Sequence, residues 1–195
     1  AEEHAALFAS GLATQGLKPF LTIYSTFMQR AFDMLVHDIG IQNLPVRLCM
    51  DRAGLSGDDG PTHHGLFDIG YLRHVPNFVF MQPKDEEEFV DMLWTMANHD
   101  SGPIAVRYPR GSGTGAKPKN KPQKLEIGKA EVGQSGYDIG LIGLGHLFSM
   151  AAQTCTSLED QGHSVELMNP RFIKPMDGSA IMAMASNCLL YTSDA

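Results

Sequence analysis

The residues best suited to chemistry lie in one polar stretch, from Asp51 to Gly65. This stretch holds four glycines, three aspartates, two histidines and an arginine. So many polar groups could not all find partners inside a core. The stretch directly follows the apolar run 45–50, which reads as a buried parallel strand. We therefore expect a loop at the carboxyl edge of a sheet, where α/β proteins bind ligands, although a solvated surface loop has the same composition.

Two arginines, Arg52 and Arg110, each follow a predicted strand. Guanidinium groups at neighbouring strand ends could bind a phosphate by paired hydrogen bonds, but two surface salt bridges would explain the spacing equally well. His63 and His64 raise the question of a metal site. Adjacent side chains of an extended segment point in opposite directions, which argues against shared metal ligation. We predict no metal ligands.

Other candidate groups are ordinary on spacing alone. Glu2 and Glu3 have the position of solvated helix carboxylates, and an aromatic such as Phe27 at a strand-to-helix turn is usually core. Phe27 gains interest only if a flat ligand lies over its exposed face. The glycines at 140, 143 and 145 do not complete a dinucleotide fingerprint and are interpreted as a tight turn.

Composition limits the class of protein. Of 195 residues, 43% are hydrophobic and 19% charged, which is typical of a globular chain. The formal net charge of -7 argues against a nucleic-acid partner. Three cysteines without C-x-x-C spacing favour a reducing cytoplasm, and the absence of a long apolar run argues against a membrane partner. The chain has no initiating Met, so we expect an internal piece of a longer protein.

Strand-like and helix-like segments alternate along the chain. Helical spacing covers 4–16, 27–42, 85–98 and 148–160, and strand-like runs cover 19–24, 45–50, 79–81, 103–108, 138–145 and 164–168. Gly, Pro and Lys dominate 111–123, which is typical of a linker. The alternation predicts an α/β fold with parallel sheets. We expect one domain at 1–115, a linker at 116–126 and a partial second domain at 127–195.

Several motifs together resemble the 1-deoxy-D-xylulose 5-phosphate synthase family, which is transketolase-like and uses thiamine diphosphate. Resemblance to its pyrimidine-binding domain rests on A-E-E-H-A (1–5), Y-S-T-F-M-Q-R-A-F-D (24–33), D-R-A-G (51–54), D-D-G-P-T-H-H-G (58–65) and R-Y-P-R-G (107–111). The segment N-P-R-F-I-K-P-M-D (169–177) resembles its C-terminal domain. Related transketolases share D-G-P-T-H but not the Y-S-T-F-x-Q-R and Y-P-R-G elements together.

The resemblance implies roles at the cofactor. Glu2 matches the glutamate that hydrogen-bonds the pyrimidine nitrogen, which prepares the cofactor to lose its thiazolium proton. Phe27 matches the aromatic that stacks on the pyrimidine. Asp59 and His63 match catalytic polar residues near the reacting carbons, and Arg30 is a secondary candidate in the same motif.

The resemblance also implies a phosphate site. Tyr24, Arg52 and Arg110 match the residues that hold the phosphate of glyceraldehyde 3-phosphate. The implied reaction decarboxylates pyruvate and joins its two-carbon unit to this aldehyde, giving 1-deoxy-D-xylulose 5-phosphate for isoprenoid, thiamine and pyridoxal synthesis.

Further expectations follow from the family. Mg²⁺ would be bound by an N-terminal domain that these residues do not include, so this chain alone should be inactive, and the full-length enzyme should be a cytoplasmic homodimer. From about Asn187 the residues depart from the family pattern, and we assign them no role. The alternatives are another transketolase-family enzyme (a transketolase or a pyruvate dehydrogenase beta-type subunit), or a non-catalytic binding module with the same fold.

Overall fold

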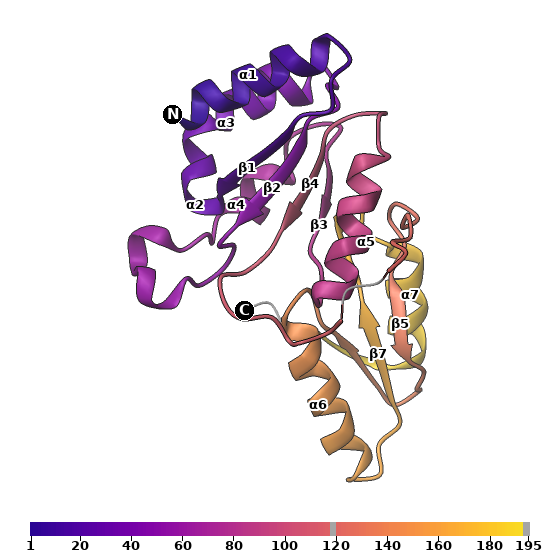
Figure 1. Cartoon of the computed structure of the whole chain (residues 1–195). Helices are drawn as coiled ribbons and strands as arrows, with labels where there is room; N and C mark the ends of the chain where they lie inside the picture. The colour runs from indigo at the N-terminus through magenta and orange to yellow at the C-terminus, as the bar shows by residue number, and fades with distance from the viewer. Residues whose placement is uncertain (118–119, 193–195) are drawn as a thin grey trace.

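Two sheets organise the chain, and the structure, a computed structural model, describes residues 1–117 and 120–192. The first sheet has the strand order β1-β2-β4-β3-β8 and the second the order β5-β7-β6-β9 (Figure 1). The strands are β1 (Phe20–Tyr24), β2 (Arg47–Asp51), β3 (Val79–Met81), β4 (Ile104–Arg107), β5 (Glu131–Gln134), β6 (Ile139–Ile142), β7 (Val165–Asn169), β8 (Phe172–Lys174) and β9 (Leu189–Thr192).

Helices cover both sheets. The longer ones are α1 (Glu2–Thr14), α5 (Glu86–Ala97), α6 (Leu147–Glu159) and α7 (Gly178–Asn187), and α4 (Asp68–Leu72) is a short one that the sequence did not predict. The helix predicted over 27–42 is present through Gly40, but it is not one regular α-helix. It is a series of short turns, namely α2 (Ser25–Met28), the 3-10 turn η1 (Gln29–Ala31), α3 (Phe32–Met34) and the π-helical η2 (Leu35–Gly40). Apolar spacing reports which face is buried and does not distinguish these closely related helical forms.

The first sheet buries both of its faces. Strands β1 to β4 run parallel to one another. Leu48 and Met50 of β2 pack in the cluster that includes the alanines of α1, whereas Cys49 between them packs in the cluster that includes Met92 and Met96 of α5. Alternation along a strand sends successive side chains to opposite faces, so helices are required on each side. Figure 1 shows α1 and α5 on the two sides of this sheet.

Helix α5 begins where its sequence predicts. The carboxylate of Asp85, the N-cap residue, accepts a hydrogen bond from the backbone N–H of Glu88 at 2.8 Å. Glu86, Glu87 and Glu88 fill the first turn, where negative charge favours the helix dipole.

Two strands depart from the parallel pairing that the sequence predicts. β8 pairs antiparallel with β3, and β5 pairs antiparallel with β7. Arg171, between β7 and β8, adopts a left-handed backbone conformation with φ 56°, which reverses the chain and sends β8 to the edge of the first sheet. Hydrophobic periodicity carries no information about strand direction, so the sequence could not reveal this.

A buried ion-pair network also joins the two halves of the chain. Glu88, 3% exposed, accepts hydrogen bonds from Arg171 Nε at 2.6 Å and from Asn169 Nδ2 at 3.0 Å. Arg171 also pairs with Glu131, which in turn pairs with Lys84. Of these charged side chains only Glu88 is fully buried, and separating the halves would remove two of its hydrogen-bond donors, Arg171 and Asn169.

In the second sheet, α6 and α7 pack in separate hydrophobic clusters. The predicted linker is partly packed, since the backbone N–H groups of Gln123 and Leu125 donate to Asp91 and Thr95 of α5.

β9 pairs parallel with β6 and extends the second sheet beyond Asn187. No helix within 1–117 and 120–192 is long and apolar enough to cross a membrane.

Candidate functional site

The predicted site residues lie around the carboxyl edge of the first sheet. β1 ends at Tyr24, β2 at Asp51 and β4 at Arg107, and the parallel pairing brings these ends together. The loop that follows β2 extends from this edge (Figure 1). It contains two 3-10 turns, η3 (Gly57–Asp59) and η4 (Pro61–His63), and backbone bridges between Gly54 and Gly65 close its base. The predicted ligand-binding loop therefore has a defined conformation, held by its own backbone.

An aromatic group occupies the turn after β1. Tyr24 and Phe27 stack with ring centroids 5.5 Å apart, and His63 meets Phe27 edge-on at 5.3 Å. The guanidinium carbon of Arg30 lies 4.9 Å from the Phe27 centroid. Residues 24–30 and His63 come from separate elements, so only the fold of the loop brings the imidazole to the phenyl ring.

Glu2 and Phe27 line the same hollow. This space, about 280 Å³, is also bordered by Ala5 of α1 and by residues 22–24 of β1. Glu2 Oε1 lies 3.8 Å from Arg30 Nη1. A hydrogen bond to its own backbone N–H at the start of α1 is the main cause that lowers the pKa of Glu2, so its side chain is an ionised acceptor at neutral pH. A carboxylate and an aromatic face on one hollow suit a flat, nitrogen-containing ring.

Arg52 and Arg110 converge on one carboxylate. Asp59 Oδ2 lies 2.8 Å from Arg52 Nε and 2.9 Å from Arg110 Nε. Arg52 also stacks over Tyr24, with its guanidinium carbon 4.0 Å from the ring centroid. The hydrogen bond from Arg52 is the main cause that lowers the pKa of Asp59. Both arginines thus point at one oxygen, which is the arrangement that a phosphate oxygen requires.

The two adjacent histidines have different contacts, although His63 ends the 3-10 turn η4 and does not lie in the extended segment that the sequence suggested. His63 Nδ1 lies 3.0 Å from the Thr62 hydroxyl. His64 turns back into the loop, where its Nδ1 accepts a hydrogen bond from the backbone N–H of Ser56 at 3.0 Å. Among the described residues, no group of three histidine, cysteine or acidic side chains could hold a metal ion.

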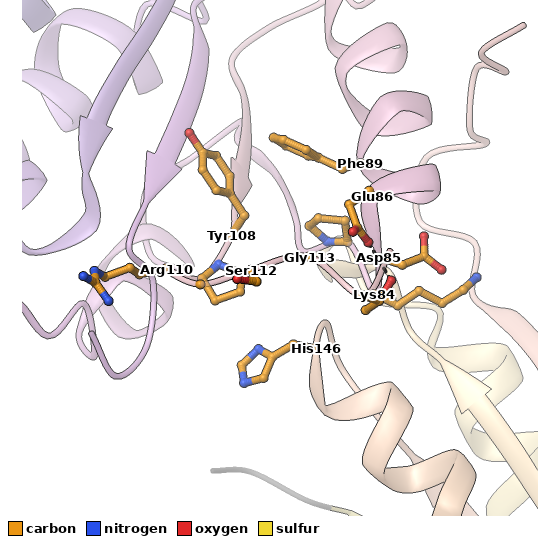
Figure 2. Close-up of a pocket in the computed structure, with 13 residues that line it drawn as sticks. Lys84, Asp85, Glu86, Phe89, Tyr108, Arg110, Ser112, Gly113 and His146 are labelled. Atoms are coloured by element: carbon orange, nitrogen blue, oxygen red, sulfur yellow. Dashed lines mark hydrogen bonds between the residues drawn. The ribbon is translucent and has the colours of Figure 1, made fainter. Parts of the chain in front are cut away.

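A second hollow, of about 270 Å³, lies beside the group formed by Arg52, Asp59 and Arg110 (Figure 2). Phe89 of α5 and Tyr108 after β4 form its aromatic wall, with ring centroids 4.8 Å apart. His146, just before α6, closes it from the second sheet's side. Figure 2 shows the guanidinium of Arg110 pointing away from this space. No role for this hollow was predicted from the sequence.

Sequence reasoning missed a buried polar group beneath the loop. Arg107 Nε donates to Asp68 Oδ2 at 2.8 Å and Nη2 to Asp68 Oδ1 at 3.1 Å, and Nη1 donates to Gln82 Oε1 at 2.6 Å. All three residues are at most 7% exposed. The only signal in the sequence was an arginine inside an otherwise apolar strand, which needs a partner when buried.

The structure brings every predicted site residue into one contiguous set of contacts. Glu2 reaches Arg30, Arg30 lies on Phe27, and Phe27 contacts both Tyr24 and His63. From Tyr24 the contacts continue through Arg52 to Asp59 and Arg110. The roles of these residues in catalysis and binding stay predictions.

Comparison with known proteins gives two family matches and close relatives. A curated relative from Acidobacterium capsulatum, called 1-deoxy-D-xylulose-5-phosphate synthase, is 59% identical over 177 residues, which cover 91% of this chain and 28% of the relative. One of the same name from Methylacidiphilum infernorum is 52% identical over 193 residues, covering 99% of this chain and 30% of the relative. The chain therefore spans less than a third of the length of these relatives.

Solved structures show the same fold. A split-gene transketolase, described as an inactive beta4 tetramer, superposes with a TM-score of 0.85 at 23% identity, over 99% of this chain and 63% of that one. A transketolase variant from Pichia stipitis gives a TM-score of 0.79 at 16% identity, over 100% of this chain and 30% of that one.

The family matches cover most of the chain. Residues 1–114 match the transketolase pyrimidine-binding domain, and residues 128–194 match the transketolase C-terminal domain, which extends beyond Asn187, where we expected the pattern to end. The first match alone includes more than half of the chain, which therefore belongs to the transketolase family and carries its pyrimidine-binding and C-terminal domains.

Proposed function

We propose that this chain supplies part of the active site of a 1-deoxy-D-xylulose-5-phosphate synthase. That enzyme condenses pyruvate, with loss of carbon dioxide, and D-glyceraldehyde 3-phosphate. The observation that carries the proposal is the single cluster in which the Glu2–Phe27 hollow adjoins the Arg52–Asp59–Arg110 group. It is supported by relatives of that name at 59% and 52% identity. A transketolase or pyruvate dehydrogenase beta-type activity has no comparable support.

The residues present fit the pyrimidine half of thiamine diphosphate. The hollow of about 280 Å³ has an ionised carboxylate at Glu2 and a ring face at Phe27. Thiamine diphosphate, when bound, would supply a carbanion centre that holds the two-carbon unit. In this assignment Glu2 shares a hydrogen bond with the pyrimidine nitrogen, Phe27 stacks on the ring, and Arg30 orients Glu2.

The acceptor would bind at the neighbouring cluster. Arg52 and Arg110 hold the phosphate of glyceraldehyde 3-phosphate, and Tyr24 orients Arg52 through the stacking contact at 4.0 Å. Asp59, which both arginines contact, gives up part of this pairing when the phosphate arrives. His63, held against Phe27, moves a proton at the reacting carbons.

The remaining assignments complete this proposal. Residues 1–115 form the pyrimidine domain, 116–126 a linker, and 127–195 part of the C-terminal domain. Mg²⁺ binds outside these residues. The enzyme works in the cytoplasm as a homodimer on small-molecule substrates, without nucleic-acid or membrane partners.

A hybrid enzyme tests the proposal. This chain would replace the matching segment of the Acidobacterium capsulatum relative, with which it is 59% identical. We expect release of carbon dioxide from pyruvate that depends on glyceraldehyde 3-phosphate, with formation of 1-deoxy-D-xylulose 5-phosphate. The Glu2→Gln hybrid is the matched inactive control. A folded hybrid without this activity, or one that prefers a ketose phosphate donor, would contradict the proposal.

The chain by itself offers a complementary test. A stacking face and one carboxylate give too little binding energy to order a flexible cofactor. Calorimetric titration with thiamine diphosphate and Mg²⁺ should show only weak binding, and no pyruvate should be decarboxylated. Low-micromolar affinity would mean that these residues hold a complete cofactor site.

A further inference from the structure

Arg107 is the centre of a buried polar group with Asp68 and Gln82. This group lies against Gly65, the end of the loop 52–65 that follows β2. Arg107 is the last residue of β4, and its guanidinium forms two hydrogen bonds to the carboxylate of Asp68. Asp68 is 1% exposed. In this buried, low-dielectric surrounding, the charged hydrogen bonds are strong and hold the two side chains in one geometry. Nη2 also lies 3.5 Å from the carbonyl oxygen of Gly65, which ends the loop that carries His63.

Gly65 connects this group to the turn that carries Phe27. A Cβ atom at Gly65 would lie 2.5 Å from both Cβ and Oγ of Ser25, so the backbone of the loop lies directly against the Ser25 side chain of the turn. Ser25 precedes Phe27 by two residues, and Gly65 follows His63 by two. A shift of the Gly65 carbonyl therefore moves the loop relative to the turn, and with it the edge-on contact of His63 on Phe27 at 5.3 Å.

Gln82 extends the group to the second half of the chain. Its carbonyl oxygen accepts from Arg107 Nη1 at 2.6 Å, and its amide lies directly against the backbone of Gly145. Gly145 adopts φ 60° and leaves no room for a Cβ atom beside Gln82. The next residue, His146, has its pKa lowered by burial and also by the charge of Arg107. Gly145 thus packs against the same Gln82 side chain that holds Arg107.

We propose that Arg107 is a positioning residue that sets the His63–Phe27 contact, and that Gln82 makes this setting depend on the docking of the C-terminal domain at Gly145. Its relevance to turnover rests on the proposed function, because His63 and Phe27 are site residues only there. The effect of Arg107 and Gln82 on the His63–Phe27 contact does not depend on that activity.

The structural test uses nuclear magnetic resonance on this chain. His63 lies edge-on to Phe27, so ring-current shifts of its imidazole protons report their separation. The eight histidines can be assigned with single His→Gln variants. Gln82→Met removes the acceptor for Arg107 but leaves the Asp68 pair, so the fold should survive. We expect the His63 signals to move in Gln82→Met and to return in Gln82→Glu, which restores an acceptor.

Two matched controls separate positioning from general loosening. Asp100→Asn weakens another buried arginine, Arg47, at the opposite end of the sheet. Gly162→Ala imposes backbone strain like that of Gly145→Ala, but a Cβ atom at Gly162 meets nothing within 4 Å. We expect Gly145→Ala to move the His63 signals and both controls to leave them in place. Unmoved signals in folded Gln82→Met, or equal movement in the controls, would overturn the inference.

The hybrid enzyme provides the link to turnover. Gln82→Met should lower kcat by about tenfold, a value at the low end for losing a hydrogen bond to a charged group because Arg107 touches no substrate. Gln82→Glu should recover most of it. If the His63 signals move in Gln82→Met but kcat does not change, Arg107 has no role in catalysis. If the His63 signals move but the unsubstituted hybrid is inactive, the proposed function is refuted and the positioning role of Arg107 remains.

Discussion

Arg110→Ala gives the cleanest test of the phosphate site. Arg110 contacts Asp59 at 2.9 Å, whereas Arg52 also pairs with Asp51 and stacks on Tyr24. Removing Arg52 would therefore disturb the loop and the aromatic group together. Removing Arg110 takes away one guanidinium and leaves Asp59 paired with Arg52.

The expected loss follows from the exposure of Arg110. A hydrogen bond to a charged group contributes about 1.5–3 kcal/mol. The Arg110 side chain is 38% exposed, and water screens such a contact, so the lower end applies. Since about 1.4 kcal/mol is a factor of ten, the Michaelis constant for glyceraldehyde 3-phosphate should rise about tenfold. The constant for pyruvate should stay within about twofold, because pyruvate carries no phosphate.

Steady-state kinetics of the hybrid enzyme measure both constants. Unphosphorylated glyceraldehyde is the control substrate, and Arg73→Ala, at an exposed arginine after α4, is the control variant. Arg73→Ala should have the Michaelis constants of the unsubstituted hybrid. With unphosphorylated glyceraldehyde, Arg110→Ala should also match the unsubstituted hybrid. Equal loss for pyruvate and the phosphorylated aldehyde, or an undiminished defect with unphosphorylated glyceraldehyde, would show that Arg110 supports the structure and binds no phosphate.

Three further predictions concern other groups. Glu2→Ala should nearly abolish turnover of the hybrid without unfolding it, and wild-type proton exchange at the cofactor's thiazolium carbon would rule out the role given to Glu2. The pKa of Asp59 is lowered from its ordinary 3.8, so the stability it contributes is present above that pH and is lost as the pH falls through the lowered value. The difference in melting temperature between wild type and Asp59→Asn should therefore be constant near neutrality and shrink below pH 3.8, and a difference independent of pH would contradict this linkage. Asp85→Ala removes the cap of α5 and should lower the free energy of unfolding by about 0.5–2 kcal/mol in urea titrations, whereas Asp58→Ala at an exposed loop position should have little effect.

The local elements that the sequence predicted well carry their own signals. Helix α5 has a capping aspartate followed by three glutamates, and its start is where these residues place it. β2 follows from an apolar run and the loop after it from a polar one. Strand direction was less accessible, because β5 and β8 run antiparallel through contacts with residues far away in the sequence.

By itself the sequence determined the α/β class, the position of the ligand loop at a strand end and, through its motifs, the candidate residues of the site. These are properties of short segments, where residue type and spacing act directly on the backbone. Only the tertiary structure decided that Arg52 and Arg110 meet at one oxygen of Asp59, since 58 positions separate the two arginines along the chain. It also decided that Arg107 lies beneath the loop, because a buried charge takes whichever partners the fold brings within hydrogen-bonding distance.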